Sequence, residues 1–236
     1  MKPMLTLFRK ELNYYVNNVL GYIVIILFAV FANFLFMKDV FVVGSASLRP
    51  FFSIIPWLFL VFIPAVVMRS FAEEKKQNTI EVLLTLPLTE SQIVIAKFAS
   101  YFILVLASLL LTFSLPVSFS FLARLYIPEI LIGYLGCLFL ASSFISVSMY
   151  FSVLTKNQII SFLASAFTLF ILLGISTELI SSLLPKMVQD ILIYFSPIYH
   201  FQNFIKGIVD LRSVYFFLSI TFLFVFLTVV HLEKRD

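Results

Sequence analysis

Charged side chains, the residue types best suited to bind partners or carry out chemistry, are concentrated in one early segment of this chain, RSFAEEKKQNTIEVLLTLPLTESQIVIAKF (residues 69–98). Eight of the 28 charged residues, counting 16 Lys and Arg with 12 Asp and Glu, lie within these 30 positions, and the flanking sequence is strongly apolar. Such a segment could dock a protein partner. The alternative is an ordinary charged loop whose apolar residues dip into the lipid surface.

Patterns typical of catalysis or ligand binding are missing from the sequence. It contains neither the G-x-x-x-x-G-K-[ST] loop that binds nucleotides nor the H-E-x-x-H pair that binds zinc. The two histidines, His200 and His231, lie far apart, and the single cysteine, Cys137, excludes an intrachain disulfide and a cysteine-rich metal site. We therefore assign no catalytic, metal or substrate residue and expect no enzyme activity or cofactor in this chain. No patch of basic and aromatic residues favours nucleic acid as a partner.

The end of the charged segment carries the signals that start a helix. Thr89 and Gln92 are three residues apart, as in a capping box, where each side chain bonds the backbone N–H of the other residue. Pro87 stands just before them and favours a break in the chain at that point. We therefore expect a helix to start near Glu90 and to continue into the apolar stretch that follows.

A short apolar piece, TIEVLLTLP, lies between the charges and this break. Asn78 and Glu81 repeat the capping-box spacing with a weaker cap, which predicts a helix of about two turns. Its Ile80, Leu83 and Leu84 share one face. A helix this short is marginal in water, so we expect a partner to hold it and to cover its apolar face.

The elements that must position this segment are membrane helices. The chain is 62% hydrophobic and only 12% charged, with a mean hydropathy of +1.10, whereas soluble domains carry about 25% charged residues. Runs of about 20 apolar residues are typical of membrane-spanning helices, because a helix satisfies its own backbone groups inside lipid. The sequence contains six such runs, at residues 19–37, 50–68, 98–123, 130–155, 157–177 and 213–232.

Prolines inside two of these runs predict kinks. Pro56 and Pro64 interrupt the second run, and Pro116 interrupts the third. Proline removes a backbone hydrogen bond and clashes with the preceding turn, so we expect neighbouring helices to accommodate the bends.

Two further stretches are too short or too polar to span a membrane. Residues 1–18 carry an apolar stripe on one helix face, which predicts an amphipathic helix lying on the membrane surface. This stripe consists of Leu5, Phe8, Leu12 and Tyr15. Residues 178–212 contain short apolar pieces that fit an external re-entrant or interfacial hairpin before the last span. Because no repeat or linker divides the chain, we expect residues 1–236 to form one all-α membrane domain.

Lysine and arginine counts predict the orientation, since these residues favour the cytoplasmic side. With the N-terminus inside and six spans, ten fall inside and six outside, so we expect both termini and residues 69–97 in the cytoplasm. Apart from His231 at the edge of the last span, the predicted spans contain no acidic or basic residue of the kind that proton-coupled carriers use. If the chain transports a substrate, the energy would therefore come from a separate ATPase docked on the charged segment, and sodium coupling through backbone carbonyls is the alternative that this argument leaves open. The rivals are a channel or secondary carrier acting alone, or a non-transporting scaffold of a motility or maturation complex.

The charged segment resembles the region after the second span in ABC-2-type ABC transporter permeases. There a Glu-Glu-Lys helix precedes a Thr-Ile-Glu helix ending in two leucines, a proline and a new helix start, which correspond here to Glu73–Lys75, Thr79–Leu84 and Pro87. Residues 9–24 are similar to that family's amphipathic entry helix. Residues 196–235 resemble the tail of one subgroup, the permeases associated with gliding motility and with nitrous-oxide reductase maturation.

That resemblance implies six membrane helices per subunit in the bacterial cytoplasmic (inner) membrane. The second permease subunit would be identical or a longer paralogue with an external domain. Two cytoplasmic ATPase subunits would bind ATP and magnesium and drive export of substrate along the interface between the permeases. The segment near residues 79–88 would be the coupling helix, seated in a groove of the ATPase. The residues expected to contact the ATPase are Glu73, Glu74, Lys75, Thr79, Ile80, Glu81, Leu83 and Leu84.

Overall fold

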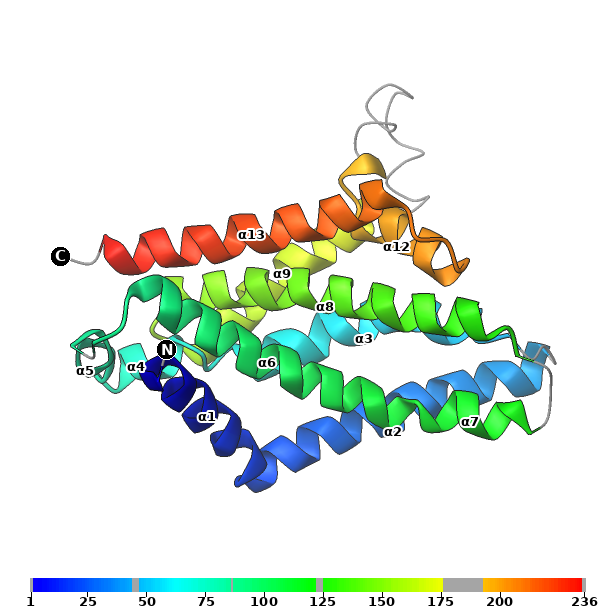
Figure 1. Ribbon diagram of the computed structural model, residues 1–236, viewed down its shortest axis with the longest axis horizontal. Coiled ribbons are helices and arrows are strands. Elements are labelled where there is room, and N and C mark those ends of the chain that lie inside the picture. The colour runs from blue at the N-terminus through cyan, green and yellow to red at the C-terminus, as the bar shows by residue number, and fades with distance from the viewer. Residues whose placement is uncertain (1, 44–46, 86, 122–124, 176–192, 235–236) are drawn as a thin grey trace.

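The computed structural model describes residues 2–43, 47–85, 87–121, 125–175 and 193–234, and the regular elements in these ranges are α-helices packed into a bundle (Figure 1). The all-α fold predicted from the sequence is therefore confirmed for these residues. The helices are α1 (Lys2–Val16), α2 (Val19–Val43), α3 (Arg49–Val67), α4 (Ala72–Lys76), α5 (Ile80–Leu84), α6 (Glu90–Thr112), α7 (Ser114–Ser120), α8 (Ile127–Leu154), α9 (Gln158–Gly174), α12 (Pro197–Ile205) and α13 (Leu211–Glu233).

Several helical segments are long and apolar enough to cross a membrane. Within the described ranges there are four, at Arg49–Lys76, Glu90–Ser120, Ile127–Leu154 and Leu211–Glu233. A fifth is present if Pro3–Val16 and Gly21–Met37, which meet at 67°, form one bent span. Helix α9 is apolar but has only 17 residues. The chain is therefore a multi-pass membrane protein, and the number of six spans stays a prediction.

Each of the six apolar runs contains a helix. Helix α6 begins at Glu90, as the capping signals predict, and ends at Thr112. The next helix, α7, begins at Ser114 and contains Pro116. Pro56 and Pro64 lie inside α3, which continues through both without a break. A kink at either proline stays a prediction.

The N-terminal amphipathic helix is present as α1, but its buried face differs from the predicted stripe. Tyr15 is buried as expected, and Leu7, which is not part of the predicted stripe, is buried too, whereas Leu5 is 50% exposed. Helix α1 packs on α6 and α2. The bundle thus covers one face of α1, and the exposed Leu5 lies on the side that remains open to lipid or solvent.

The predicted external hairpin, residues 178–212, is described only in part. Residues 178–192 lie outside the described residues, and Pro197–Ile205 forms α12. This short helix packs on α8 and α13 through Phe201 and Phe204, which are both buried.

Helix α8 is the centre of the bundle and lies between α13 and α6 in Figure 1. Residues 141–149 are all buried, because α3, α6, α9, α12 and α13 surround it. Four of its buried serines donate to carbonyl oxygens of their own helix, as Ser143 does to the carbonyl oxygen of Leu140 at 2.8 Å. Small residues of this kind let membrane helices approach closely.

The two ends of the bundle differ in what they carry. Helices α4 and α5 lie at one end with the start of α1 and the end of α13, and α12 lies at the other (Figure 1). The two ends of the described chain therefore lie at the same end of the bundle (Figure 1). That this side faces the cytoplasm stays a prediction.

Candidate functional site

The charged segment leaves the membrane bundle through a turn. Helix α3 ends at Val67, residues 68–71 form the turn, and the short helix α4 follows. Across this turn Arg69 donates from Nε to Glu73 Oε2 at 2.6 Å. The two residues are four positions apart and partly buried, so their ion pair stabilises the turn between α3 and α4.

A serine from another helix supplies the N-terminal cap of α4. The α4 N-cap residue, Phe71, has no side chain able to cap, and no side-chain hydrogen bond of its own is made there. Instead Ser152 Oγ of α8 accepts hydrogen bonds from the backbone N–H of Phe71 at 3.0 Å and of Ala72 at 3.2 Å, and donates to the carbonyl oxygen of Met68 at 3.0 Å. Backbone groups that a helix start leaves without partners are thereby satisfied.

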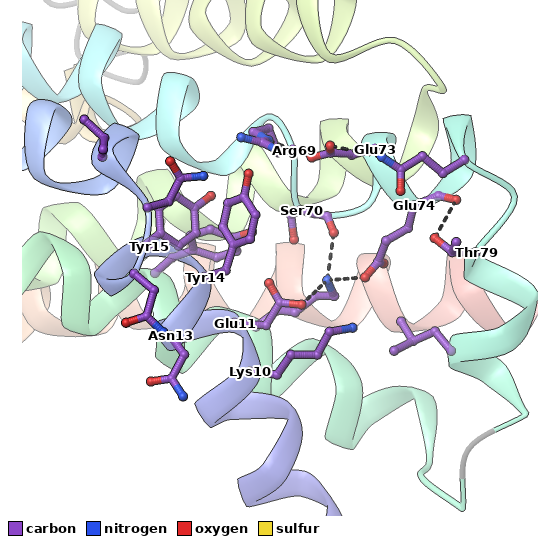
Figure 2. A pocket seen from close by; sticks show the side chains of 17 residues that line it. Lys10, Glu11, Asn13, Tyr14, Tyr15, Arg69, Ser70, Glu73, Glu74 and Thr79 are labelled. Atoms are coloured by element: carbon purple, nitrogen blue, oxygen red, sulfur yellow. Dashed lines mark hydrogen bonds and ion pairs between the residues drawn. The ribbon is translucent and has the colours of Figure 1, made fainter.

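Lys97, near the start of α6, has a buried ammonium that collects three acceptors. It donates to Glu11 Oε1 at 3.0 Å, to Glu74 Oε1 at 2.8 Å and to the carbonyl oxygen of Ser70 at 2.8 Å. Figure 2 shows Glu11, Ser70 and Glu74 converging on this one point. We call these four residues the Lys97 cluster. The ring of Phe71, 5.1 Å from the ammonium, closes another side, so the charge is shielded from solvent and fully paired.

Lys75, which follows Glu74 in α4, contacts a different helix. Lys75 is 3% exposed, and its ammonium donates to the carbonyl oxygen of Val153 at the end of α8. A lysine at this position satisfies a carbonyl that the helix end leaves without an intrahelical partner, and it complements the negative end of the helix dipole. Consecutive residues Glu74 and Lys75 thus fix α4 to α6 and to α8.

Helix α5 turns its apolar side inward. Ile80 and Leu83 are only 5% and 6% exposed and belong to the chain's own hydrophobic core. Thr79 and Glu81 are exposed on the outer side. Of the apolar face that the sequence assigns to a partner, Ile80 and Leu83 are thus covered by the chain itself. The placement of the Leu84 side chain lies outside the described residues.

The prediction that Asn78 caps α5 is wrong. The N-cap is Thr79, which makes no side-chain hydrogen bond to the helix, and Thr79 Oγ1 instead donates to the carbonyl oxygen of Glu74 at 3.4 Å. Asn78 has φ of 55°, a left-handed conformation that asparagine tolerates better than most residues. Asn78 ends α4, because the backbone N–H of Thr79 donates to the carbonyl oxygen of Glu74 at 2.9 Å and that of Asn78 to the carbonyl oxygen of Lys75 at 3.4 Å.

The capping box at the start of α6 is confirmed. The backbone N–H of Gln92 donates to Thr89 Oγ1, and the backbone N–H of Thr89 donates to Gln92 Oε1, both at 3.4 Å. Pro87 is exposed and lies in the irregular stretch between α5 and α6, where the sequence predicts a break.

An open groove of about 1210 Å³ runs between α1, the turn after it, and α4 with α5. Three acidic side chains, Glu11, Glu73 and Glu74, face three basic ones, Lys10, Arg69 and Lys97, along its walls. In the part of the chain that the structure describes, no group of three His, Cys, Asp or Glu residues is placed to hold a metal ion.

The structure brings together residues that the sequence pattern does not connect. Glu73, Glu74 and Lys75 were assigned to a partner, yet Glu74 and Lys75 bind inside the chain. Lys97 and Glu11 were not assigned at all. The available signal was that Lys97 follows directly on an apolar helix start, IVIA, where a charge needs a partner.

Comparison with known proteins gives one family. The family model described as ABC-2 family transporter protein matches residues 47–236, which takes in α3 to α13 and leaves α1 and α2 outside. The comparison with curated proteins finds no match.

Proposed function

This chain belongs to the ABC-2 transporter family, and from that premise we propose that it is the permease subunit of an ATP-driven exporter. The ATPase would be a separate cytoplasmic subunit that binds ATP and magnesium, because the sequence has no nucleotide-binding loop of its own. Two permease subunits and two ATPase subunits would form the transporter. Substrate would leave along the interface of the permeases.

The proposal includes six spans in the bacterial cytoplasmic membrane with both termini inside. The supporting observations are the excess of lysine and arginine on the inner side and the position of α4, α5 and both described chain ends at one end of the bundle (Figure 1). The resemblance of residues 196–235 to the gliding-motility and nitrous-oxide reductase maturation subgroup supports a longer paralogue as the second permease.

The observation that carries the proposal is the two-sided character of α5. Its apolar side, with Ile80 and Leu83, is anchored in the permease core, while Thr79 and Glu81 face outward. A helix of only five residues would not hold its shape in water without such an anchor. We infer that Ile80 and Leu83 hold the coupling helix in place and that its polar side contacts the ATPase.

The anchored helix has a direct route into the membrane bundle. Helix α4, which precedes α5, is fixed to the end of α8 by Ser152 and by Lys75. Helix α8 in turn contacts α3, α6, α9 and α13. A force applied to α5 by the ATPase would therefore reach the central helix through hydrogen bonds and not through a flexible loop.

Glu81→Lys tests this function. Tagged permease is purified from host membranes, and the preparation is assayed for hydrolysis of Mg-ATP. We expect ATPase activity to co-purify with the native chain and to fall at least tenfold with Glu81→Lys. The matched control is Glu233→Lys, another exposed glutamate at the same end of the bundle, which should retain the activity. Native chain that transports or assembles without co-purifying ATPase activity would contradict the proposal and favour a lone carrier or a scaffold.

A further inference from the structure

The two carboxylates of the Lys97 cluster belong to different helices, Glu11 to α1 and Glu74 to α4. Both are mostly buried, with 14% and 18% of their side chains exposed, while Lys97 is 1% exposed. Two like charges repel strongly where water is excluded. The Lys97 ammonium between them replaces this repulsion with two ion pairs, and so its charge holds α1 and α4 together.

Two other contacts fasten α1 to the same region. The hydroxyl of Tyr15 donates to the carbonyl oxygen of Val66 at 2.9 Å, near the end of α3. The Arg69 guanidinium lies 4.9 Å from the centre of the Tyr14 ring. Helix α1 is therefore attached to the end of α3 and to the turn that leads into α4, and the Lys97 cluster is the point where it meets α4 itself (Figure 2).

We propose that Lys97 is a positioning residue that makes α1 follow α4 and α5 when the ATPase moves them. The inference rests on the proposed function, in which α5 receives that movement. Glu74 and Glu11 are the two ends of the link, and the Lys97 ammonium is the joint between them. The amphipathic helix is thus a moving part of the transporter and not a passive anchor on the membrane surface.

Amide hydrogen exchange of the reconstituted complex tests the link. Permease and ATPase in lipid nanodiscs are compared without nucleotide and after trapping with Mg-ATP and vanadate, and exchange is followed in peptides from α1 and from α5. In the native complex we expect nucleotide to change exchange in both helices. With Lys97→Met the α5 change should persist and the α1 change should be lost.

Further variants separate the link from simple loss of stability. Glu11→Gln keeps the ion pair between Lys97 and Glu74 and should also abolish the α1 change. Lys97→Arg keeps the charge and should restore it. Lys76→Met removes an exposed lysine from α4 and should leave both changes intact. Because the readout is the nucleotide-dependent difference, a general loosening of α1 in every state does not imitate the expected result.

Failure of the inference is distinguishable from failure of the proposed function. If α5 in the native complex does not respond to nucleotide, the proposed function is wrong and the link falls with it. If α5 responds while α1 does not, or if α1 still responds in both Lys97→Met and Glu11→Gln, only the link is overturned.

Discussion

Gly136 of α8 lies so close to Phe204 of α12 that a Cβ atom added at Gly136 would be 2.5 Å from the Cβ of Phe204. Phe204 is fully buried, and its Cβ is fixed to the backbone, so the side chain cannot rotate away from such a contact. The absence of a side chain at Gly136 is therefore what allows α12 to rest on the central helix.

Gly136→Ala should destabilise the protein by about 1–3 kcal/mol, the usual cost of overpacking a core. Gly133→Ala on the same helix is the matched comparison, because there an added Cβ would meet the ring edge of Phe52 at 2.5 Å and not a backbone-fixed atom. A ring edge can shift more easily, so we expect the smaller loss for Gly133→Ala. Thermal unfolding of the purified proteins in detergent measures both, and an equal or reversed order would contradict this account of the packing.

What could be read from the sequence depends on how far apart the interacting residues lie. The capping box at Thr89 and Gln92 is local, since it spans four residues, and the sequence predicts it correctly together with the start of α6. The inward face of α5 was recognised as apolar, but whether the chain or a partner covers it depends on packing that the pattern does not contain.

The contacts that organise the site are long-range and were missed for that reason. Glu11 and Lys97 are 86 residues apart, and Phe71 and Ser152 are 81 residues apart. No periodicity or motif links such pairs. The failed cap at Asn78 has a local cause instead: α4 ends at Lys76, and Asn78 takes φ 55° as part of the turn that closes α4, so it is not available to cap α5.

Thr89→Ala should shorten α6 at its first turn. The Thr89 hydroxyl accepts the backbone N–H of Gln92, and loss of an N-cap costs about 1 kcal/mol. Faster amide hydrogen exchange in peptides that include Gln92 and Ile93 is the expected result. Thr89→Ser retains the accepting oxygen and should exchange like the native protein. Unchanged exchange in Thr89→Ala would show that tertiary packing, and not the cap, holds this helix start.

Cysteine labelling tests the six-span topology, and in particular whether the 17-residue α9 crosses the membrane. Single cysteines at Gln77, Lys156 and Lys206, all exposed, are treated in intact cells with a membrane-impermeant maleimide. The native Cys137 is buried and should stay unlabelled. We expect Lys206→Cys to react in intact cells, and Gln77→Cys and Lys156→Cys to react only after permeabilisation. Labelling of Lys156→Cys and Lys206→Cys on the same side would mean that α9 does not span.

Ser152→Ala should release the start of α4 from the bundle. The substitution leaves the backbone N–H groups of Phe71 and Ala72 and the carbonyl of Met68 without the hydroxyl that now pairs them. Unpaired buried backbone groups cost about 1–3 kcal/mol each, although local rearrangement or water would recover part of that loss. We expect a lower unfolding temperature and faster tryptic cleavage after Lys75 and Lys76, because α4 must open before the protease can bind.

Ser148→Ala separates this effect from the loss of any buried hydroxyl in α8. Ser148 is as buried as Ser152, but its hydroxyl donates to the carbonyl oxygen of Phe144 within its own helix. That carbonyl already accepts the helical N–H bond, so removal of the hydroxyl should change neither stability nor cleavage appreciably. Equal cleavage rates in the two variants would show that Ser152 does not hold α4, and the route from α5 to α8 would then rest on Lys75 alone.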